Sequence, residues 1–481
     1  MSTDIRYPEL KFYIDGQWTA GSGSATREVI DPADESVIGL LPMATAADLD
    51  LALAAAAKGF SQWRRYAPGR RAEILLEAAH LLRARSAQIA PLTTLEQGLP
   101  LAESAGYIQR GADFLEWDAN EGRRAYGRVI PSEPGLRNLV VREPIGVVAA
   151  FSPWNAPIVT PCRKLGSALA AGCAIVLKAA EEAPATTMAL VQAFHDAGVP
   201  PGVINLVYGD PATISAHLIA APIVRLVTFT GSVPVGKHLA RLAAGEMKPS
   251  IMELGGHAPV IVCEDADVEV AAQRTGGVKF RNAGQACIAP SRFFVHDAVY
   301  DRFVSAFAAV AAKIKVGSGM DPAVTMGPVS SARRLAAMQS LVDDALACGA
   351  VRVHGGRRIG ERGWFFEPTV LGEVPDTARV MREEPFGPVA ALTRFTDLED
   401  AVGRANALPY GLAGYVFTRS AATASKLAER LECGAIGINH LVISTTGIPF
   451  GGVKDSGHGR EGGSEGIAGY MIEKTITHLY D

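Results

Sequence analysis

The surroundings of Cys287 differ from those of the other cysteines. It follows residues 282–286 (NAGQA), a run of small and amide-bearing residues. A nucleophilic thiol needs its thiolate form, room for a carbonyl group, and donors for the oxyanion that develops on attack; Gly284 leaves room for that approach. Taken alone, Cys287 has an alternative interpretation, as a buried residue that packs in the core. The cysteines beside apolar or small neighbours are predicted to be buried packing residues: Cys173, Cys263 and Cys348.

Two further segments carry side chains that would complete this chemistry. Glu253, in residues 252–256 (MELGG), ends an apolar strand before two glycines, and it could take a proton from water and direct hydroxide at an acyl-enzyme. Asn155, in residues 151–155 (FSPWN), follows a strand at a proline-fixed turn. Its amide is a suitable oxyanion donor at the carboxyl edge of a sheet. The alternatives are a solvated acid for Glu253 and an ordinary turn residue for Asn155.

A nucleotide site is indicated by residues 230–236 (TGSVPVG), where a strand is expected to run into a helix. Backbone N–H groups around Gly231, Ser232 and Gly236 could hold a pyrophosphate at the helix N-terminus. The glycine spacing differs from the GxGxxG pattern of dinucleotide-binding folds. Lys178 and Glu181 end another apolar strand and add ribose-binding capacity, and a carboxylate there would repel a 2′-phosphate.

The elements that must position these residues alternate along the chain. From about residue 145, short β-branched runs alternate with helical stretches, which is typical of βαβ units on a parallel sheet. Beyond about residue 255 the alternation resumes with new elements, so a second α/β domain is expected. Residues 122–143 have strand-forming ends around a turn at 131–135 and predict a protruding hairpin.

Composition excludes several classes of protein. At 481 residues the chain is long enough for two or three large units. A net charge of -4 provides no basic field for nucleic acid. We find neither a membrane-spanning run nor a secretory leader, so the cytoplasm is the expected location and no membrane partner is expected. The six cysteines lack paired spacing, so neither a disulfide framework nor a metal site is expected.

Together these segments resemble the aldehyde dehydrogenase superfamily, and the resemblance covers nearly the whole chain. The family's asparagine, glutamate and cysteine motifs are matched by residues 153–155 (PWN), 253–256 (ELGG) and 284–287 (GQAC). Residues 384–388 (EPFGP) look like the family segment that holds the nicotinamide riboside, and residues 449–452 (PFGG) resemble the stretch near its substrate tunnel. Five ordered motifs make the match specific. Within the superfamily, the motifs are most similar to NAD(P)-dependent succinate-semialdehyde dehydrogenases.

The resemblance implies oxidation of an aldehyde to a carboxylic acid through a thiohemiacetal and a thioester on Cys287. Asn155 and the Cys287 backbone N–H would hold the oxyanion, and Glu253 would activate the hydrolytic water. Relatives that transfer the acyl group to coenzyme A lack this glutamate, so a free acid is the expected product. The side chains implied in coenzyme binding, beside those named above, are Trp154, Leu254, Glu384 and Phe386.

The expected coenzyme is NAD⁺, with NADP⁺ possible. Glu181 matches the family position where an acid favours NAD⁺. The family's KPxE is KAAE here, and Ala179 in place of proline leaves the strictness of that preference open. His257 stands where the family commonly has lysine, and the sequence assigns it no role.

The resemblance also implies a substrate that carries its own carboxylate. Arg163 and Arg281 match positions that hold the carboxylate in succinic semialdehyde dehydrogenases, and Ser444 is a third contact, with Thr445 as a competing alignment. Phe450 is expected near the substrate. Ordinary ion pairs are the alternative for both arginines. Enzymes for aromatic aldehydes and other ω-oxo acids resemble this subgroup, so these substrates stay open. Human-type members have a second cysteine where this chain has Ala289, so no local disulfide control is expected.

The predicted fold is α/β, with a Rossmann-like coenzyme-binding domain, an α/β catalytic domain and a small β oligomerisation element. The expected coenzyme-binding domain covers residues 1–121 and 144–254, and the catalytic domain covers 255–464. Residues 122–143 and 465–481 form the oligomerisation element, which would join subunits into a homodimer or homotetramer by β-augmentation.

Two readings from other classes compete with this one. A catalytically idle relative kept as a structural or binding protein would have no need to retain Cys287, Glu253 and Asn155 together. A nucleotide-independent cysteine hydrolase would need a histidine beside the thiol. The nearest histidines in sequence, His257 and His296, lie in no such context.

Overall fold

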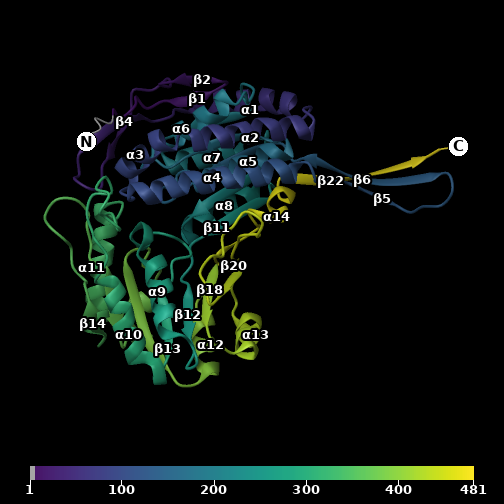
Figure 1. Cartoon of the computed structure of the whole chain (residues 1–481). Helices are drawn as coiled ribbons and strands as arrows, with labels where there is room; N and C mark the ends of the chain where they lie inside the picture. The colour runs from purple at the N-terminus through teal and green to yellow at the C-terminus, as the bar shows by residue number, and fades with distance from the viewer. Residues whose placement is uncertain (1–5, 481) are drawn as a thin grey trace.

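The computed structural model of the chain describes residues 6–480, which fold around two large β-sheets and a thin projecting arm (Figure 1). Within that range, the first sheet has eight strands in the order β2-β1-β9-β8-β7-β10-β11-β21. Its central strands, from β9 to β11, run parallel, whereas β1, β2 and β21 are antiparallel to their neighbours. The strands are β1 (Phe12–Ile14), β2 (Gln17–Thr19), β7 (Val147–Phe151), β8 (Ala174–Lys178), β9 (Ile204–Val207), β10 (Val224–Gly231), β11 (Ser250–Leu254) and β21 (Gly457–His458).

The order of these strands fixes where a ligand can bind. The chain proceeds outward from β7 to β8 and β9, and then returns to the other side of β7 with β10 and β11. In an open parallel sheet, the reversal leaves a crevice outside the carboxyl ends of the two strands that flank it. These strands are β7 and β10, so the loop that contains Asn155 and the turn at Ser232 open onto the same crevice.

The strands of this sheet are apolar on both faces because helices cover both sides. All residues of β7 (VVAAF) and β8 (AIVLK) are buried, as expected for central parallel strands. The helix α1 starts at a capping box, in which Thr45 and Asp48 exchange side chain to backbone hydrogen bonds of 2.9 and 3.3 Å. The helices associated with the sheet are α1 (Ala46–Trp63), α2 (Pro68–Ala84), α3 (Ser86–Gln97), α4 (Leu101–Gly122), α5 (Val159–Ala171), α6 (Pro184–Asp196), α7 (Pro211–Ala220) and α8 (Val233–Gly245).

The second sheet has seven strands in the described chain, in the order β14-β15-β16-β13-β12-β18-β19, and all of them except β14 run parallel. A separate apolar core surrounds it. Its strands are β12 (Pro259–Val262), β13 (Arg292–His296), β14 (Val351–His354), β15 (Thr369–Gly372), β16 (Val389–Phe395), β18 (Ala413–Phe417) and β19 (Ala435–Ile438). Its helices are α9 (Val268–Lys279), α10 (Asp297–Ala311), α11 (Ala332–Ala347), α12 (Leu398–Asn406) and α13 (Ala421–Arg430), with short 3₁₀ turns η1 (Arg281–Gly284) and η2 (Arg379–Met381).

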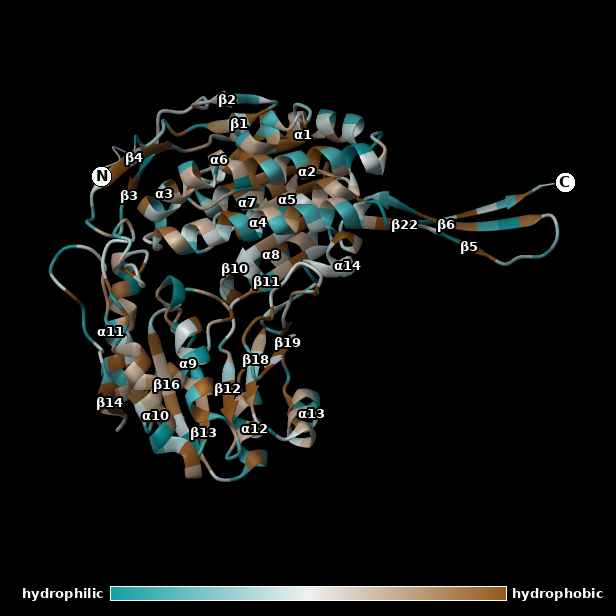
Figure 2. Cartoon of the chain, in the orientation of Figure 1, coloured by the Kyte–Doolittle hydropathy of each residue, from teal (hydrophilic) through white to brown (hydrophobic). Residues whose placement is uncertain are grey.

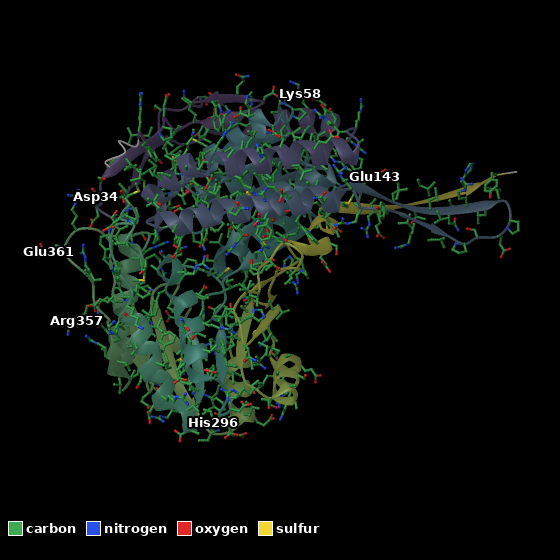
Figure 3. The ribbon with its side chains drawn as sticks, in the orientation of Figure 1. Asp34, Lys58, Glu143, His296, Arg357 and Glu361 are labelled. Atoms are coloured by element: carbon green, nitrogen blue, oxygen red, sulfur yellow. The ribbon has the colours of Figure 1, made fainter. Side chains whose placement is uncertain are left out.

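The two sheets meet through a short connection. Residues 255–258 lead from the carboxyl end of β11 directly to the amino end of β12. The carboxyl edge of the first sheet therefore faces the amino edge of the second, where the loops before β13 and β16 lie. Arg358 and Arg362 add surface ion pairs to Glu35 and Asp34, which tie the second unit to the N-terminal region; Asp34 and Glu361 are labelled there in Figure 3.

The projecting arm is a three-stranded antiparallel sheet in the order β22-β6-β5 (Figure 1). It consists of β5 (Arg128–Ile130), β6 (Leu136–Pro144) and β22 (Met471–Leu479), and β22 pairs with β6 along its whole length. Glu143, labelled at its base in Figure 3, forms an ion pair of 2.6 Å with Lys474. Figure 2 shows apolar residues along the arm, and exposed ones include Val129, Ile472 and Leu479. The arm leaves this apolar surface uncovered within one chain.

The α/β fold class is confirmed. The remaining elements are α14 (Gly463–Ala468) and two small pairs of strands, β3 (Thr26–Ile30) with β4 (Val37–Pro42) and β17 (Tyr410–Gly411) with β20 (Val453–Lys454). Among residues 6–480, no helix has both the length and the apolar character needed to cross a bilayer.

Candidate active site

A cavity of about 320 Å³ lies where the two sheet edges face each other. Its wall contains most of the side chains that the sequence singled out. These are Trp154, Asn155, Arg163, Gly231, Ser232, Glu253, Leu254, Cys287, Glu384, Phe386, Ser444 and Phe450. Four others lie outside the wall: Lys178, Glu181, Gly236 and Arg281.

The loop that presents Cys287 has an uncommon backbone. Asn282, Ala283 and Gly284 have consecutive left-handed φ values of 48°, 49° and 71°, a conformation that non-glycine residues rarely adopt. A Cβ on Gly284 would lie 2.2 Å from the carbonyl oxygen of Gly387, so only glycine fits. The Asn282 side chain holds the loop in place: it donates to the carbonyl of Asn155 at 3.0 Å and accepts from Gln97 at 2.8 Å.

Cys287 is half-buried in the cavity wall. Burial raises its pKa to about 12, and nearby carboxyl groups add to the increase, whereas the charge of Arg163 opposes it. The thiolate therefore forms only when a base removes the proton or a positive charge approaches.

Asn155 bridges the two halves of the site. Its side-chain nitrogen donates a hydrogen bond of 3.0 Å to the carbonyl of Gln285, two residues before Cys287. A primary amide has two N–H groups, so a second donor remains for an oxyanion in the cavity. The bond to Gln285 fixes where that donor points.

Glu253 lies at the end of β11 and is only 2% exposed. Neither carboxyl oxygen has a hydrogen-bond partner among the described residues. Burial raises the pKa of Glu253 well above its usual value, and the charge of Glu461 raises it further, while Lys164 and Arg163 oppose the increase. A Cβ on Gly451 would lie 2.8 Å from Glu253 Oε1, so this glycine leaves space for the carboxyl group.

A buried ion pair stands behind Glu253. Lys164 and Glu461 are 2.8 Å apart and almost fully buried, and Lys164 also donates to the Thr228 hydroxyl at 3.0 Å. Glu461 lines the cavity as well. Neither Lys164 nor Glu461 was among the residues predicted for the site.

The other side of the cavity fits a dinucleotide. Ser232 precedes α8 without a side-chain cap, so the first N–H groups of the helix are free to meet a phosphate. The hydroxyl of Thr230 is buried and unpartnered among the described residues, and it lines the same wall. Trp154 and Phe386 meet edge to face with ring centres 5.7 Å apart. These donors and flat apolar surfaces suit phosphate and nicotinamide groups.

Glu384 is held close to the strand connection. Its carboxylate accepts an N–H bond of 3.3 Å from Gly256, and a Cβ on Gly255 would lie 2.4 Å from its Oε2. Burial raises the pKa of Glu384 to about 8. Arg334 donates to the carbonyl oxygens of Pro385 and Phe386 and so fixes the loop.

The remaining residues predicted to bind the coenzyme lie outside the cavity wall. Lys178 and Glu181 form a buried ion pair of 2.6 Å at the end of β8, and Arg27 lies 3.8 Å from the same carboxylate. Gly236 lies in α8, where a Cβ would be 2.3 Å from the side chain of Leu254. It therefore allows the helix to pack closely against β11.

Arg163 provides a cation in the wall opposite the coenzyme side. Its guanidinium carbon lies 4.0 Å from the ring centre of Phe114 and 4.8 Å from that of Phe450. Nη2 donates to the Ser444 hydroxyl at 2.8 Å, whereas Nη1 is buried without a partner among the described residues. The arrangement leaves a charged donor available to an anion.

Arg281 is placed differently. It is exposed and absent from the cavity wall, and its charge acts on Glu103, Tyr107 and Arg110. The left-handed turn that begins at Asn282 separates it from Cys287. Arg110 and Tyr107, which were not predicted for the site, line the cavity instead.

One prediction about the cysteines is wrong. Cys173 and Cys263 are buried, but Cys348 is exposed. Cys348 follows the last turn of α11, and its neighbours Ala347 and Gly349 are exposed with it, whereas Ala345 and Ala350 are buried. His257 is buried, with Nδ1 2.7 Å from the Ser291 hydroxyl and Nε2 3.0 Å from the carbonyl oxygen of Val380.

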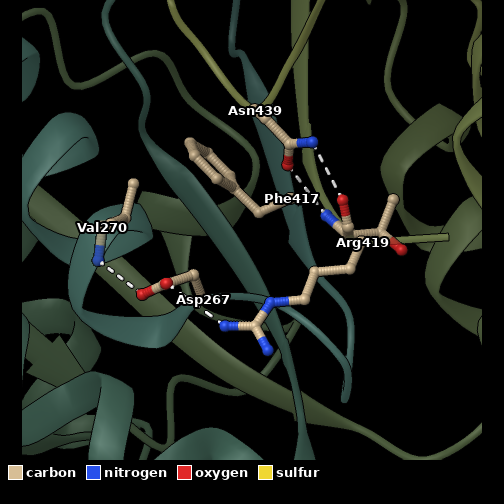
Figure 4. A pocket seen from close by; sticks show the side chains of 6 residues that line it. Asp267, Val270, Phe417, Arg419 and Asn439 are labelled. Carbon is tan, nitrogen blue, oxygen red and sulfur yellow. Dashed lines mark hydrogen bonds and ion pairs between the residues drawn. The ribbon is translucent and has the colours of Figure 1, made fainter. Parts of the chain in front are cut away.

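A second pocket, on the surface of the unit that contains the second sheet, carries no comparable chemistry (Figure 4). Its polar groups satisfy one another: Asp267 accepts from Val270 and Arg419, and Asn439 exchanges hydrogen bonds with Thr418. Within the described chain, no group of three or more His, Cys, Asp and Glu side chains is placed to hold a metal ion.

Comparison with known proteins agrees with this geometry. Residues 18–476 match the Aldehyde dehydrogenase family. A 4-(hydroxymethyl)benzenesulfonate dehydrogenase from Comamonas testosteroni is 49% identical over 100% of both chains. The NADP(+) succinate-semialdehyde dehydrogenase of Escherichia coli is 41% identical over 95% of both. The crystal structure of a succinate-semialdehyde dehydrogenase from Burkholderia pseudomallei superposes with a TM-score of 0.97 at 42% identity, covering 100% of this chain and 99% of that one. The chain belongs to the aldehyde dehydrogenase family and is an NAD(P)-dependent oxidoreductase.

Proposed function

We propose that this protein oxidises an aldehyde with a remote anionic group to the corresponding carboxylic acid, with succinate semialdehyde as the first candidate. The observation that carries the proposal is the unpartnered Nη1 of Arg163, buried in the wall of the cavity that also contains Cys287. A buried cationic donor without an acid in contact favours an anionic ligand. The succinate-semialdehyde dehydrogenases among the relatives support this choice.

In the proposed reaction, the Cys287 thiolate adds to the carbonyl carbon, and the carbonyl electron pair moves onto oxygen. The second N–H of Asn155 and the backbone N–H of Cys287 stabilise this oxyanion. A dinucleotide held beside Ser232, Trp154 and Phe386 would supply the acceptor for the hydride that leaves this carbon. Collapse of the oxyanion leaves a thioester on Cys287.

Glu253 then removes a proton from water, whose oxygen attacks the thioester carbonyl. The C–S bond breaks, the Cys287 thiolate leaves, and the free acid is released. Glu253 must be ionised for this step. The charges of Lys164 and Arg163 favour its ionised form against the effect of burial.

The test is spectrophotometric. Purified protein with succinate semialdehyde and NAD⁺ or NADP⁺ should give one reduced nicotinamide per succinate formed, and mass spectrometry identifies the acid. Reduction that is equally fast with butanal would contradict the anionic substrate. Ester hydrolysis without nucleotide, accompanied by no coenzyme reduction with any aldehyde, would contradict the oxidative reaction.

A second candidate is an aromatic aldehyde with an anionic substituent. The benzenesulfonate in the name of the Comamonas relative, 49% identical to this chain, supports it. A ring would pack against apolar wall residues such as Phe450 and Ile288. Both candidates share a remote anion, which a cationic side chain in the wall would bind.

For the coenzyme, we infer a preference for NAD⁺, with NADP⁺ also accepted. Glu181 supports it because a carboxylate at the end of β8 repels a 2′-phosphate. Lys178 and Arg27 lie beside that carboxylate and offset part of the repulsion. Dissociation constants for the two coenzymes, measured by fluorescence titration, test the preference; tighter binding of NADP⁺ would contradict it.

We also infer that the eight-stranded, seven-stranded and three-stranded sheets belong to the coenzyme-binding, catalytic and oligomerisation units, respectively. The uncovered apolar residues of the arm support pairing with another subunit in a homodimer or homotetramer. Ile476→Lys should convert the assembly to smaller species in light-scattering chromatography. A chain that is monomeric without the substitution would contradict the inference.

A further inference from the structure

A larger cavity of about 670 Å³ adjoins the candidate active site, and the two share Arg110 and Ser444 as wall residues. One face of α4 and the loop after β19 form its wall. It is more open than the inner cavity and leads outward from it, so a ligand longer than the inner cavity would extend past Arg110.

Among the charged side chains of this wall, Arg110 has no ion-pair partner in the described part of the chain. In residues 6–480 no acid lies within ion-pair distance of its guanidinium, although other charged side chains of the wall are paired. Asp113 and Glu116 both contact Arg83, at 2.7 and 2.6 Å. Arg124 pairs with Glu121. Burial and the neighbouring charge of Arg281 lower the pKa of Arg110, and the nearby Tyr107 and Asp113 oppose this decrease. A bound anion would further favour the charged form of Arg110.

Arg110 and Arg163 lie at different depths. The charge of Arg163 is among the main influences on the pKa values of Cys287 and Glu253, whereas the charge of Arg110 is not. Arg110 lies one helical turn before Phe114, whose ring covers Arg163 at 4.0 Å, and four residues of helix correspond to about 6 Å of rise. The two cations therefore mark an inner and an outer position along one path.

The wall between these positions is aromatic and rigid. Phe114 lines the outer cavity with Trp117, whose indole N–H donates to the carbonyl of Gly463 at 3.1 Å. Tyr107, Arg110, Phe114 and Trp117 recur at spacings of three and four residues, so they share one face of α4. Such a surface packs against a flat ring.

We propose that Arg110 forms an outer anion site, which binds the carboxylate or sulfonate of aldehydes whose anion is held away from the carbonyl by an aromatic ring or a longer chain. Arg163 serves the shorter semialdehydes. The proposal rests on the proposed function, in which the substrate carries a remote anion, and it adds a residue that sets the length of substrate accepted.

The test compares kcat/KM for three aldehydes. They are 4-formylbenzenesulfonate, its neutral analogue 4-(methylsulfonyl)benzaldehyde, and succinate semialdehyde. Arg110→Gln should lower the value for the sulfonate at least about tenfold, mainly through KM, because a charge-assisted hydrogen bond contributes about 1.5–3 kcal/mol. The neutral analogue and succinate semialdehyde should change less than about twofold. Arg110→Lys keeps the charge and should recover most of the activity with the sulfonate.

The matched control is Arg123→Gln, at an exposed arginine after the end of α4 that lies outside both cavities; it should leave all three values unchanged. Calorimetric titration with 4-sulfobenzoate, the expected product, gives a second readout that needs no turnover. Its dissociation constant should rise about tenfold or more in Arg110→Gln and stay constant in Arg123→Gln.

Equal losses for the sulfonate and its neutral analogue would overturn the proposal, as would an unchanged dissociation constant for 4-sulfobenzoate. An equal loss for succinate semialdehyde would overturn the assignment of two depths. If the unmodified protein oxidised none of the three aldehydes, the proposed function would fail, and calorimetry alone would then decide whether the outer anion site exists.

Discussion

Replacing Arg163 with methionine should separate charged from neutral substrates. The guanidinium is 5% exposed and lies between two phenylalanine rings, with one nitrogen bound to Ser444 and one free. A substrate carboxylate bound to that nitrogen would form a charge-assisted hydrogen bond, which contributes about 1.5–3 kcal/mol. Its loss lowers kcat/KM about 10- to 150-fold, since each 1.4 kcal/mol is about a factor of ten.

Methionine has a similar length and packs well between aromatic rings, so it should fill the space between Phe114 and Phe450. The assay follows reduced nicotinamide with succinate semialdehyde and with butanal, which lacks the carboxylate. The value for butanal should change less than about threefold. Circular dichroism and the Tm verify that the variant is folded.

Arg281→Met provides the comparison, because Arg281 is exposed and lies outside the cavity wall. It should change kcat/KM for succinate semialdehyde less than about threefold. Equal losses on the two aldehydes in Arg163→Met would refute the carboxylate contact. A loss in Arg281→Met as large as that in Arg163→Met would refute the placement of the anion at Arg163.

Three further predictions concern the nucleophile, its loop and the coenzyme. Burial raises the pKa of Cys287 to about 12 and that of Glu253 well above its usual value; both groups must lose a proton, so kcat/KM should rise with pH through the neutral range. A profile already flat above about pH 5, where ordinary glutamates are ionised, would contradict this. Gly284→Ala should abolish oxidation and lower the Tm, because the alanine Cβ would lie 2.2 Å from the Gly387 carbonyl oxygen and φ at this position is 71°. Retained activity would refute the claim that only glycine fits here. Glu181→Gln should raise the affinity for NADP⁺ relative to NAD⁺ several-fold in fluorescence titrations, and an unchanged ratio would show that this carboxylate does not set the preference.

Local patterns predicted the α/β class, and they singled out the loop before Cys287 as unusual. The β-branched runs at 145–151 and 173–178 are parallel strands buried on both faces, which explains why they are almost entirely apolar. The glycine at 284 sits where the chain must be left-handed and must approach another backbone. Such requirements are local, so residue type alone reveals them.

Side chains brought together by tertiary packing were harder to predict. Arg110 reaches the cavity from α4, and Glu461 approaches Lys164 from nearly 300 positions away in the sequence. Arg281 is close to Cys287 in sequence, but it is absent from the cavity wall, and its charge acts on Tyr107 and Arg110, which do line the wall. The spacing of aromatic and arginine residues along one face of residues 107–117 was the available signal for Arg110.

Lys178 and Glu181 show a third limit. Their residue types suggested ribose binding, but the structure pairs them with each other at 2.6 Å and with Arg27 nearby. A sequence gives the charges at a strand end without their partners from other segments, and those partners decide how much charge is left for a ligand.

The central claim is that substrate becomes attached to Cys287 and that Glu253 releases it. Glu253→Gln should therefore accumulate the thioester when it is given NAD⁺ and succinate semialdehyde, because water is no longer activated. Intact-mass spectrometry should find one added succinyl group, peptide mapping should place it on Cys287, and hydroxylamine should remove it. No adduct despite reduction of the coenzyme, or an adduct on another residue, would contradict the account.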